Sequence, residues 1–342
     1  DRELRCLVRA ADEANARSRL ADNLARYGLP IDAAEAATVI PGDLTRERFG
    51  LDRAAWDAMA HDLGLVLHNG AAVDFFRDYT ALRGANVVAA RTAVDLALKA
   101  GAALDLVSTI GVATGGRAGT VDEATPLEDL RDGLEGGYEQ TKWVAEALVA
   151  AAARRGLDTR CYRPGRVAPA AVRSPGTGNH DDFAGRFLLG CLELGQAPDL
   201  ELPMDVTPVD HVARAVVALC RGGAVPAGST WHLMHPTPTP YRALFDAARD
   251  AGHALDLVPL ADWLAALASE ASPERLAPVR ALVAGREIDA AREVLTPDRA
   301  LSVLDSSASH RVLAELGVGA PAIDEAWCRA VIERLAGVLP QA

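Results

Sequence analysis

Tyr138 and Lys142 are the two residues of this sequence best suited to acid–base chemistry. They lie four residues apart in a stretch with a helical pattern that continues to about Arg155, so both side chains project from one face of a helix. An ammonium beside a phenol favours the phenolate, and the spacing therefore predicts a Tyr138 pKa below its usual value of about 10. Such a phenol can exchange a proton with a reacting oxygen. The spacing can also arise by chance, but Lys99 is the one other lysine in the chain.

Short β-branched runs alternate with helical patterns through the first half of the chain. Strands are expected at 4–8, 37–41, 65–68, 104–109 and 159–163, and helices at 11–27, 82–100 and 136–155. This alternation predicts an α/β fold, a Rossmann-type doubly wound parallel sheet covered by helices on both faces. Ligands of such sheets bind beyond the carboxyl ends of the strands. The residues that fall there are Arg9, Asp43, Asn69, Thr109 and Pro164.

The usual beginning of a dinucleotide-binding fold is missing from the sequence. That beginning is a strand, a Gly-rich turn and a helix whose amino end binds the pyrophosphate. This chain starts in what looks like the second strand, so a first βα unit of roughly 30 residues is absent. We expect that the unit has been lost, because a sheet without its central strand would expose the edges of two others. The alternative is that the protein never had it.

The regular alternation stops after Val167, which suggests a second, smaller part. We expect a Rossmann domain over 1–167, to which 204–235 returns with a helix at 206–221 and a strand at 230–233. Between them, 168–203 should form a loop and a helix at 181–195 over the active site. The segment 236–342 should form a smaller, mostly α-helical C-terminal substrate domain, with helices at 241–251, 260–267, 273–284 and 323–335.

Composition excludes several classes of protein. The chain has 342 residues, half of them apolar, and can bury a sizeable core. It contains no run of about 18 uninterrupted apolar residues, so no membrane span is expected, and its charged amino end is unlike a signal peptide. The net charge of -12 disfavours general nucleic-acid binding. Five widely spaced cysteines, and histidines without ligand partners at metal spacing, predict a cytoplasmic protein with no metal site.

Six short motifs recur in a characteristic order and spacing. They are Cys6 to Ala10, Pro41 to Leu44, His68 to Ala71, Val107 to Thr109, the Tyr138/Lys142 pair and Arg163 to Val167. Together they resemble the thioester reductase domains that terminate nonribosomal peptide synthetases, which are extended short-chain dehydrogenases, and the related reductase domains of carboxylic acid reductases. The resemblance covers nearly the whole chain and departs from the family in the missing Gly-rich turn and in a longer loop at 168–174.

The resemblance implies a catalytic group made of Thr109, Tyr138 and Lys142. Ser108 could supply the same hydroxyl as Thr109, but successive residues of a strand point to opposite faces, and the family pattern selects Thr109. Asn86 is then either a buried polar brace for the catalytic region or an ordinary helix asparagine.

The resemblance also implies NADPH as the cofactor. Arg9 and Arg19 would hold the adenosine 2′-phosphate, for which a planar, permanently charged guanidinium is suited. Solvated arginines at these two positions, and a helix cap at Asp43, are the alternatives. The remaining cofactor-binding residues implied are Asp43, Leu44, Asn69, Gly70, Ala71, Thr109, Tyr138, Lys142, Pro164 and Val167.

The function implied is reductive release of an acyl or peptidyl thioester as an aldehyde, with a possible second reduction to the alcohol. The expected partner is an upstream carrier protein bearing a phosphopantetheine thioester, and the chain would be a monomeric domain of a larger synthetase in antibiotic biosynthesis. Three alternatives stay open. They are another extended short-chain dehydrogenase with a soluble substrate, a non-redox cyclase, and a nucleotide-binding scaffold without turnover.

Overall fold

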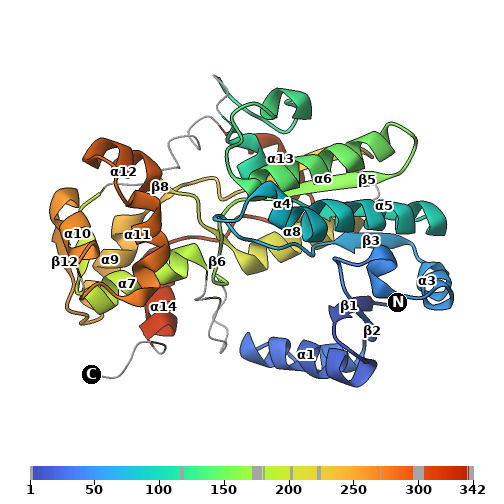
Figure 1. The fold of residues 1–342 in the computed structure, drawn as a ribbon, viewed down its shortest axis with the longest axis horizontal. Helices are drawn as coiled ribbons and strands as arrows, with labels where there is room; N and C mark the ends of the chain where they lie inside the picture. The colour runs from blue at the N-terminus through green and yellow to red at the C-terminus, as the bar shows by residue number, and fades with distance from the viewer. Residues whose placement is uncertain are drawn as a thin grey trace.

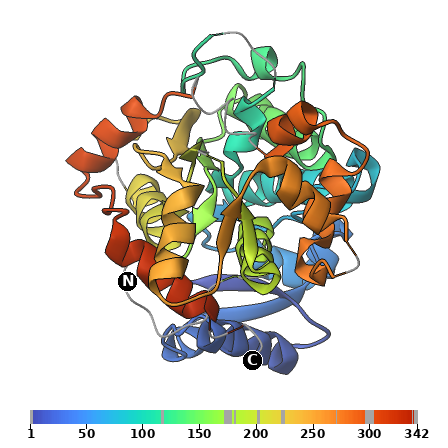
Figure 2. The same cartoon turned by 90° about the vertical axis from the view of Figure 1, so that its left-hand side faces the viewer.

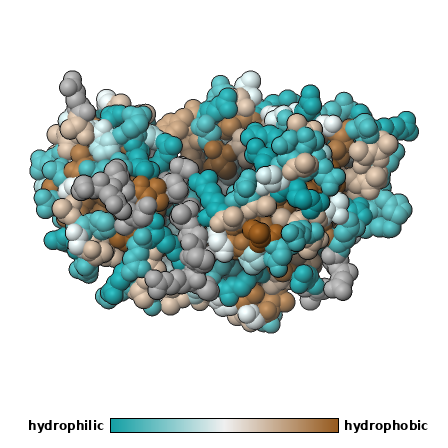
Figure 3. Space-filling model, turned by 90° about the horizontal axis from the view of Figure 1, so that it is seen from below, coloured by the Kyte–Doolittle hydropathy of each residue, from teal (hydrophilic) through white to brown (hydrophobic). Residues whose placement is uncertain are grey.

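The computed structural model describes residues 3–115, 119–171, 179, 182–200, 203–221, 225–269, 271–295, 304–336 and 338. A part built on parallel strands carries the N-terminus, and a mostly helical part carries the C-terminus (Figure 1). Within the described residues, no helix combines the length and apolar character needed to cross a membrane. From below, the surface is largely hydrophilic with apolar areas of limited extent (Figure 3).

Four parallel strands form the main sheet, in the order β10-β5-β4-β3. Successive residues of β5 lie on opposite faces of the sheet. Cys161 packs with α5 and α6, whereas Tyr162 packs with α8 and β10. The sheet is therefore covered on both faces, as the alternation predicts. The elements are β3 (Leu65–His68), β4 (Ala103–Val107), β5 (Thr159–Pro164), β10 (Ser229–Leu233), α5 (Ala89–Ala100), α6 (Gly137–Ala153) and α8 (Val209–Arg221).

Two further strands, β1 (Arg5–Arg9) and β2 (Thr38–Gly42), form a separate parallel pair with α1 (Glu13–Arg26) beside it. Among the described strands, none hydrogen-bonds both β1 and β3. Leu67 of β3 is accordingly 47% exposed. Arg5 ties the pair to the rest of the chain, because its guanidinium donates to the carbonyls of Met59 (3.2 Å) and His61 (2.7 Å) at the end of α3 (Arg53–Ala60).

The helix expected at 82–100 starts earlier and contains a wider turn. The Asp78 carboxylate caps α4 (Tyr79–Arg83) by accepting the Ala81 N–H at 2.9 Å. A π-helical turn, Gly84–Val88, joins α4 to α5, and Gly101, at φ 64°, ends the helix. The helix expected at 206–221 begins only at Val209, because Pro208 belongs to the short strand β9.

The helical part has its own apolar core, with Trp263 fully buried among Phe187 and Phe245. The C-terminal helices stand in front of the sheet in Figure 2. α7, expected over the active site, packs into this core, while α13 instead packs on α8 and β10. The helices are α7 (Phe183–Leu194), α9 (Tyr241–Asp250), α10 (Leu260–Leu267), α11 (Ala277–Val283), α12 (Ile288–Leu295), α13 (Ser307–Glu315) and α14 (Glu325–Ala336).

Short elements complete the structure. Part of the loop expected at 168–174 falls on residues outside the described ones. The helices α3, α12 and α13 were not expected from the sequence pattern. Besides four short 3-10 helices, the described residues contain α2 (Asp32–Glu35) and the strand pairs β6 (Val167–Ala168) with β9 (Thr207–Pro208), β7 (Gln196–Pro198) with β12 (Asp256–Val258), and β8 (Pro203–Met204) with β11 (Thr239–Pro240).

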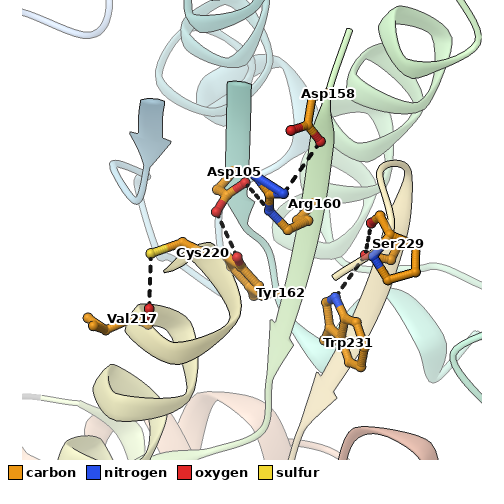
Figure 4. Close-up of polar contacts among 9 residues, drawn as sticks. Asp105, Asp158, Arg160, Tyr162, Val217, Cys220, Ser229 and Trp231 are labelled. Carbon is orange, nitrogen blue, oxygen red and sulfur yellow. Dashed lines mark hydrogen bonds and ion pairs between the residues drawn. The ribbon is translucent and has the colours of Figure 1, made fainter. Parts of the chain in front are cut away.

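A buried ion pair joins β4 to β5 inside the sheet (Figure 4). Arg160 Nε donates to Asp105 Oδ1 at 2.9 Å, and the Tyr162 hydroxyl donates to Asp105 Oδ2 at 2.7 Å. The Asp105 side chain is 0% exposed and that of Arg160 is 9% exposed. Arg160 also donates to the exposed Asp158 carboxylate, at a longer 3.4 Å, so removing Asp105 would leave the buried guanidinium with this one weaker counter-charge among the described residues.

We expect Asp105→Asn to lower the free energy of unfolding by about 3–5 kcal/mol, the cost typical of breaking a buried pair. Urea denaturation would measure the loss. The matched control is Asp57→Asn, which breaks the exposed Asp57–Lys99 pair (2.8 Å) and should leave the free energy of unfolding nearly unchanged. Equal losses in the two variants would contradict a stabilising role for the buried pair.

His68, the last residue of β3, makes stability depend on pH. Burial, and next the nearby Lys142 ammonium, lower its pKa from 6.5 to about 4. The unfolded chain therefore binds a proton at His68 between these pH values and the folded chain does not, so the contribution to stability falls as pH drops from 6.5 towards 4.

We expect this difference to destabilise the fold by about 2 kcal/mol at pH 5 relative to pH 7. His68→Gln should flatten the pH dependence of the unfolding free energy by that amount, whereas His61→Gln, which changes an exposed histidine, should not. An unchanged pH dependence in His68→Gln would show that His68 titrates alike in both states.

Candidate active site

The loops that follow the strands meet at the carboxyl edge of the sheet. Leu44, after β2, packs directly on Gly70, after β3, and any side chain at position 70 would overlap it. A side chain at position 70 would therefore require the end of the Leu44 side chain to move. Thr109 follows β4, and Pro164 ends β5. The structure thus brings the predicted positions to a common edge.

Tyr138 and Lys142 both reach from α6 to the end of β4. The Lys142 ammonium donates to the Val107 carbonyl at 2.7 Å, and Tyr138 is hydrogen-bonded to the Thr109 side chain. Both are buried, with 3% and 8% of the residue exposed for Lys142 and Tyr138. The neighbouring Ser108 hydroxyl is buried and has no hydrogen-bond partner in the described part of the chain. Thr109, rather than Ser108, therefore faces Tyr138.

The expected depression of the Tyr138 pKa is wrong for this structure. Burial, and next the charge of Glu139, raise the pKa of Tyr138 to about 12, and the hydrogen bond with Thr109 opposes the rise only in part. Burial also lowers the pKa of Lys142. The physical reason is that the free energy needed to remove the phenolate from water is larger than the stabilisation that neighbouring groups give it. Tyr138 is consequently protonated at neutral pH.

Asn86 is the buried brace that the sequence analysis left undecided. It lies in the π-helical turn and is 2% exposed. Its Oδ1 accepts the Ala72 N–H at 2.7 Å, and its Nδ2 donates to the Ala72 carbonyl at 3.0 Å and to the Thr141 hydroxyl at 2.9 Å. Thr141 in turn donates to the Tyr138 carbonyl at 2.8 Å. Asn86 thus ties the loop after β3 to the helix of Tyr138.

Most residues predicted to bind the cofactor's adenosine end are accessible. Arg9, Arg19 and Asn69 are exposed, and Ala71 is partly exposed. Asp43 does not cap a helix but closes a turn, because its Oδ1 accepts the Thr45 N–H (2.9 Å) and hydroxyl (2.7 Å). These bonds, and more weakly the charges of Arg46 and Arg9, lower the Asp43 pKa. Arg9 and Asp43 are therefore close enough for their charges to interact.

The turn after β5 is organised by Asp205, which the sequence analysis did not single out as a site residue. Its Oδ2 accepts the Arg166 N–H at 2.9 Å, and a side chain at Gly165 would overlap the carboxylate. Pro164 is buried, whereas Val167 is 40% exposed at the start of β6. Only the fold reveals this contact, because Asp205 lies 39 residues beyond Arg166. In the described residues, no group of three or more His, Cys, Asp or Glu side chains could hold a metal ion.

Comparison with known proteins places the chain in a family. Residues 1–216 match the NAD-binding family described as male sterility protein. A linear gramicidin synthase of Brevibacillus parabrevis is 35% identical over 277 residues, which are 79% of this chain and 5% of that protein. The large subunit of the L-2-aminoadipate reductase of Eremothecium gossypii is 34% identical over 290 residues. The match covers 78% of this chain and 20% of that subunit. The chain thus spans a small fraction of these relatives.

A solved structure is similar over nearly the full chain. The terminal R domain from the myxalamid PKS-NRPS biosynthetic pathway is 32% identical, with a TM-score of 0.84 over 99% of this chain and 86% of that one. The predicted family resemblance and the Rossmann-type α/β fold are therefore confirmed. Sequence and fold agree that the chain belongs to the male sterility protein family of NAD(P)-binding extended short-chain dehydrogenases.

Proposed function

We propose that the protein catalyses the NADPH-dependent reductive release of an acyl or peptidyl group from a thioester, as an aldehyde. The observation that carries the proposal is the meeting of Tyr138, Thr109 and Lys142 at the end of β4. The similarity to a reductase and to the R domain of a PKS-NRPS pathway supports the same reaction class.

The residues at the carboxyl edge fit a nicotinamide dinucleotide phosphate. Arg9 and Arg19, both exposed cations, would hold the 2′-phosphate. Both Thr45 bonds go to Oδ1 of Asp43, and Oδ2 has no partner among the described residues, so Oδ2 can accept the adenine amine. The remaining contacts are those proposed for Leu44, Asn69, Gly70, Ala71, Lys142, Pro164 and Val167.

Bound NADPH supplies the hydride that adds to the thioester carbonyl carbon. The hydroxyl groups of Thr109 and Tyr138 then hydrogen-bond the carbonyl oxygen as it becomes negative. Tyr138, protonated because burial raises its pKa, donates the proton that completes a hemithioacetal. The carbon–sulfur bond then breaks, the hydroxyl proton passes to sulfur, and aldehyde and thiol leave. In this proposal Lys142 orients the cofactor ribose.

A carrier protein bearing a phosphopantetheine thioester is the partner that this reaction would need in a synthetase. The gramicidin synthase relative is much longer than this chain, which supports a role as one domain of a larger enzyme. At a net charge of -12 the chain cannot attract an acidic carrier over long distances, so recognition would rely on local contacts and on the thioester arm. Carrier-bound substrate should therefore be reduced more efficiently than the same acyl group on a truncated thiol.

We expect Tyr138→Phe to reduce aldehyde formation by about 10²-fold or more, because the proton donor is lost with little change in volume. NADPH consumption and aldehyde trapping with an acyl-pantetheine substrate would measure the rate, and NADPH fluorescence would show that the cofactor still binds. Tyr27→Phe, at the end of α1, is the matched control and should retain full activity. Near-wild-type activity in Tyr138→Phe would contradict the mechanism.

We expect Arg9→Ala to weaken NADPH binding by about 2 kcal/mol, roughly thirtyfold, and to leave NADH binding nearly unchanged. The reason is the loss of a charge-assisted hydrogen bond to the 2′-phosphate. Fluorescence titration with both cofactors measures the effect, and Arg26→Ala at the far end of α1 is the control. Equal weakening of both cofactors would make Arg9 structural and remove the support for NADPH.

A further inference from the structure

Three large apolar side chains are exposed together in the segment between β3 and α4. Val73 is 63% exposed, Phe75 50% and Phe76 54%, whereas Phe49, Phe187 and Phe245 are buried. In Figure 1 this segment extends from the sheet towards the helical part. Single exposed apolar residues are common on proteins, but a contiguous group marks a binding surface. We call these three residues the apolar loop.

The apolar loop is held in one conformation at both ends and in the middle. Asn86 fixes Ala72 just before it. The Asp74 carboxylate accepts the N–H groups of Phe76 (2.9 Å) and Arg77 (3.1 Å). Gly137, at the start of α6, lies so close to the backbone of 77–79 that any side chain there would overlap it. The exposed side chains are therefore preorganised, which reduces the entropy that binding would cost.

The apolar loop also lies against the reacting phenol. The rings of Phe75 and Tyr138 make an edge-to-face contact, with centroids 5.4 Å apart. Asn86 links Ala72 to Thr141, Phe75 contacts Tyr138, and the backbone of 77–79 lies against Gly137. The segment 72–79 therefore runs along α6 towards the amino end of the helix. Lys142, proposed to hold the ribose, lies one turn further in the opposite direction. The apolar loop thus borders Tyr138 directly, through Phe75.

We infer that Val73, Phe75 and Phe76 form the wall that binds the acyl chain beside the thioester carbonyl, and that the enzyme selects apolar acyl groups of medium or greater length. This inference rests on the proposed thioester reduction. A long aliphatic or aromatic acyl group would cover the apolar loop and gain the free energy of removing both surfaces from water. A short or charged acyl group would leave it exposed.

The test compares acetyl-pantetheine with octanoyl-pantetheine, two free thioesters that need no carrier. Val73→Ser/Phe76→Ser removes two apolar side chains while leaving Phe75 against Tyr138. We expect wild-type kcat/KM for octanoyl to exceed that for acetyl by about tenfold or more, and the double variant to lose most of this preference while acetyl reduction stays within about twofold. Leu98→Ser, which changes an exposed apolar residue of α5, is the control and should keep the preference.

The outcomes separate this inference from the proposed function. Reduction of neither thioester by the wild type would overturn the proposed function. Reduction of both with equal efficiency, or an unchanged preference in the double variant, would overturn the acyl-binding role alone. A raised KM for NADPH with both substrates would assign the apolar loop to the cofactor. A loss confined to carrier-bound thioesters would assign it to carrier docking, and either result would overturn the inference.

Discussion

The buried amide of Asn86 is the interaction on which the geometry of the site depends most. It satisfies the backbone of Ala72 and the hydroxyl of Thr141 at once, and Thr141 satisfies the Tyr138 carbonyl. Leaving any of these buried groups without a partner costs about 1–3 kcal/mol. The loop after β3 and the helix that carries Tyr138 are therefore held in one relative position. Asn86 lies in the π-helical turn, a local irregularity of the kind that often occurs at functional sites.

Burial, more than charge pairing, sets the protonation of the site. It raises the pKa of Tyr138 and lowers those of Lys142 and His68, so each group is pushed towards its neutral form. A protonated phenol suits a proton donor, which is the role the proposed reduction assigns to Tyr138. The ammonium of Lys142 is held by the Val107 carbonyl, a hydrogen bond that fixes its position beside β4.

Two different surfaces lie next to α6. The parallel strands bring polar and small residues to one edge, where Leu44 and Gly70 pack without space between them. The amino end of α6 meets a preorganised apolar segment instead, through Phe75 and Gly137. In the proposed reaction the nucleotide would bind the first surface and the apolar acyl chain the second, which contacts Tyr138 through Phe75.

Features that depend on short-range periodicity could be predicted from the amino-acid sequence. The strands β1 to β5, the helix of Tyr138 and Lys142, and the clustering of Arg9, Asp43, Asn69 and Thr109 after strands all follow from alternation and spacing. The break in alternation after Val167 likewise predicted helices such as α9 and α10. These patterns repeat every two to four residues, so a single sequence is enough to recognise them.

Features that depend on distant partners emerged only from the folded chain. Asn86 and Thr141 are 55 residues apart, and Asp105 and Tyr162 are 57 residues apart. Neither contact has a signal in local spacing. The same holds for the direction of the Tyr138 pKa shift, because the Lys142 spacing is visible in the sequence but the burial that outweighs it is not. Burial is a property of the whole fold, and it makes the pKa of the Tyr138 phenol rise where the sequence had predicted a fall.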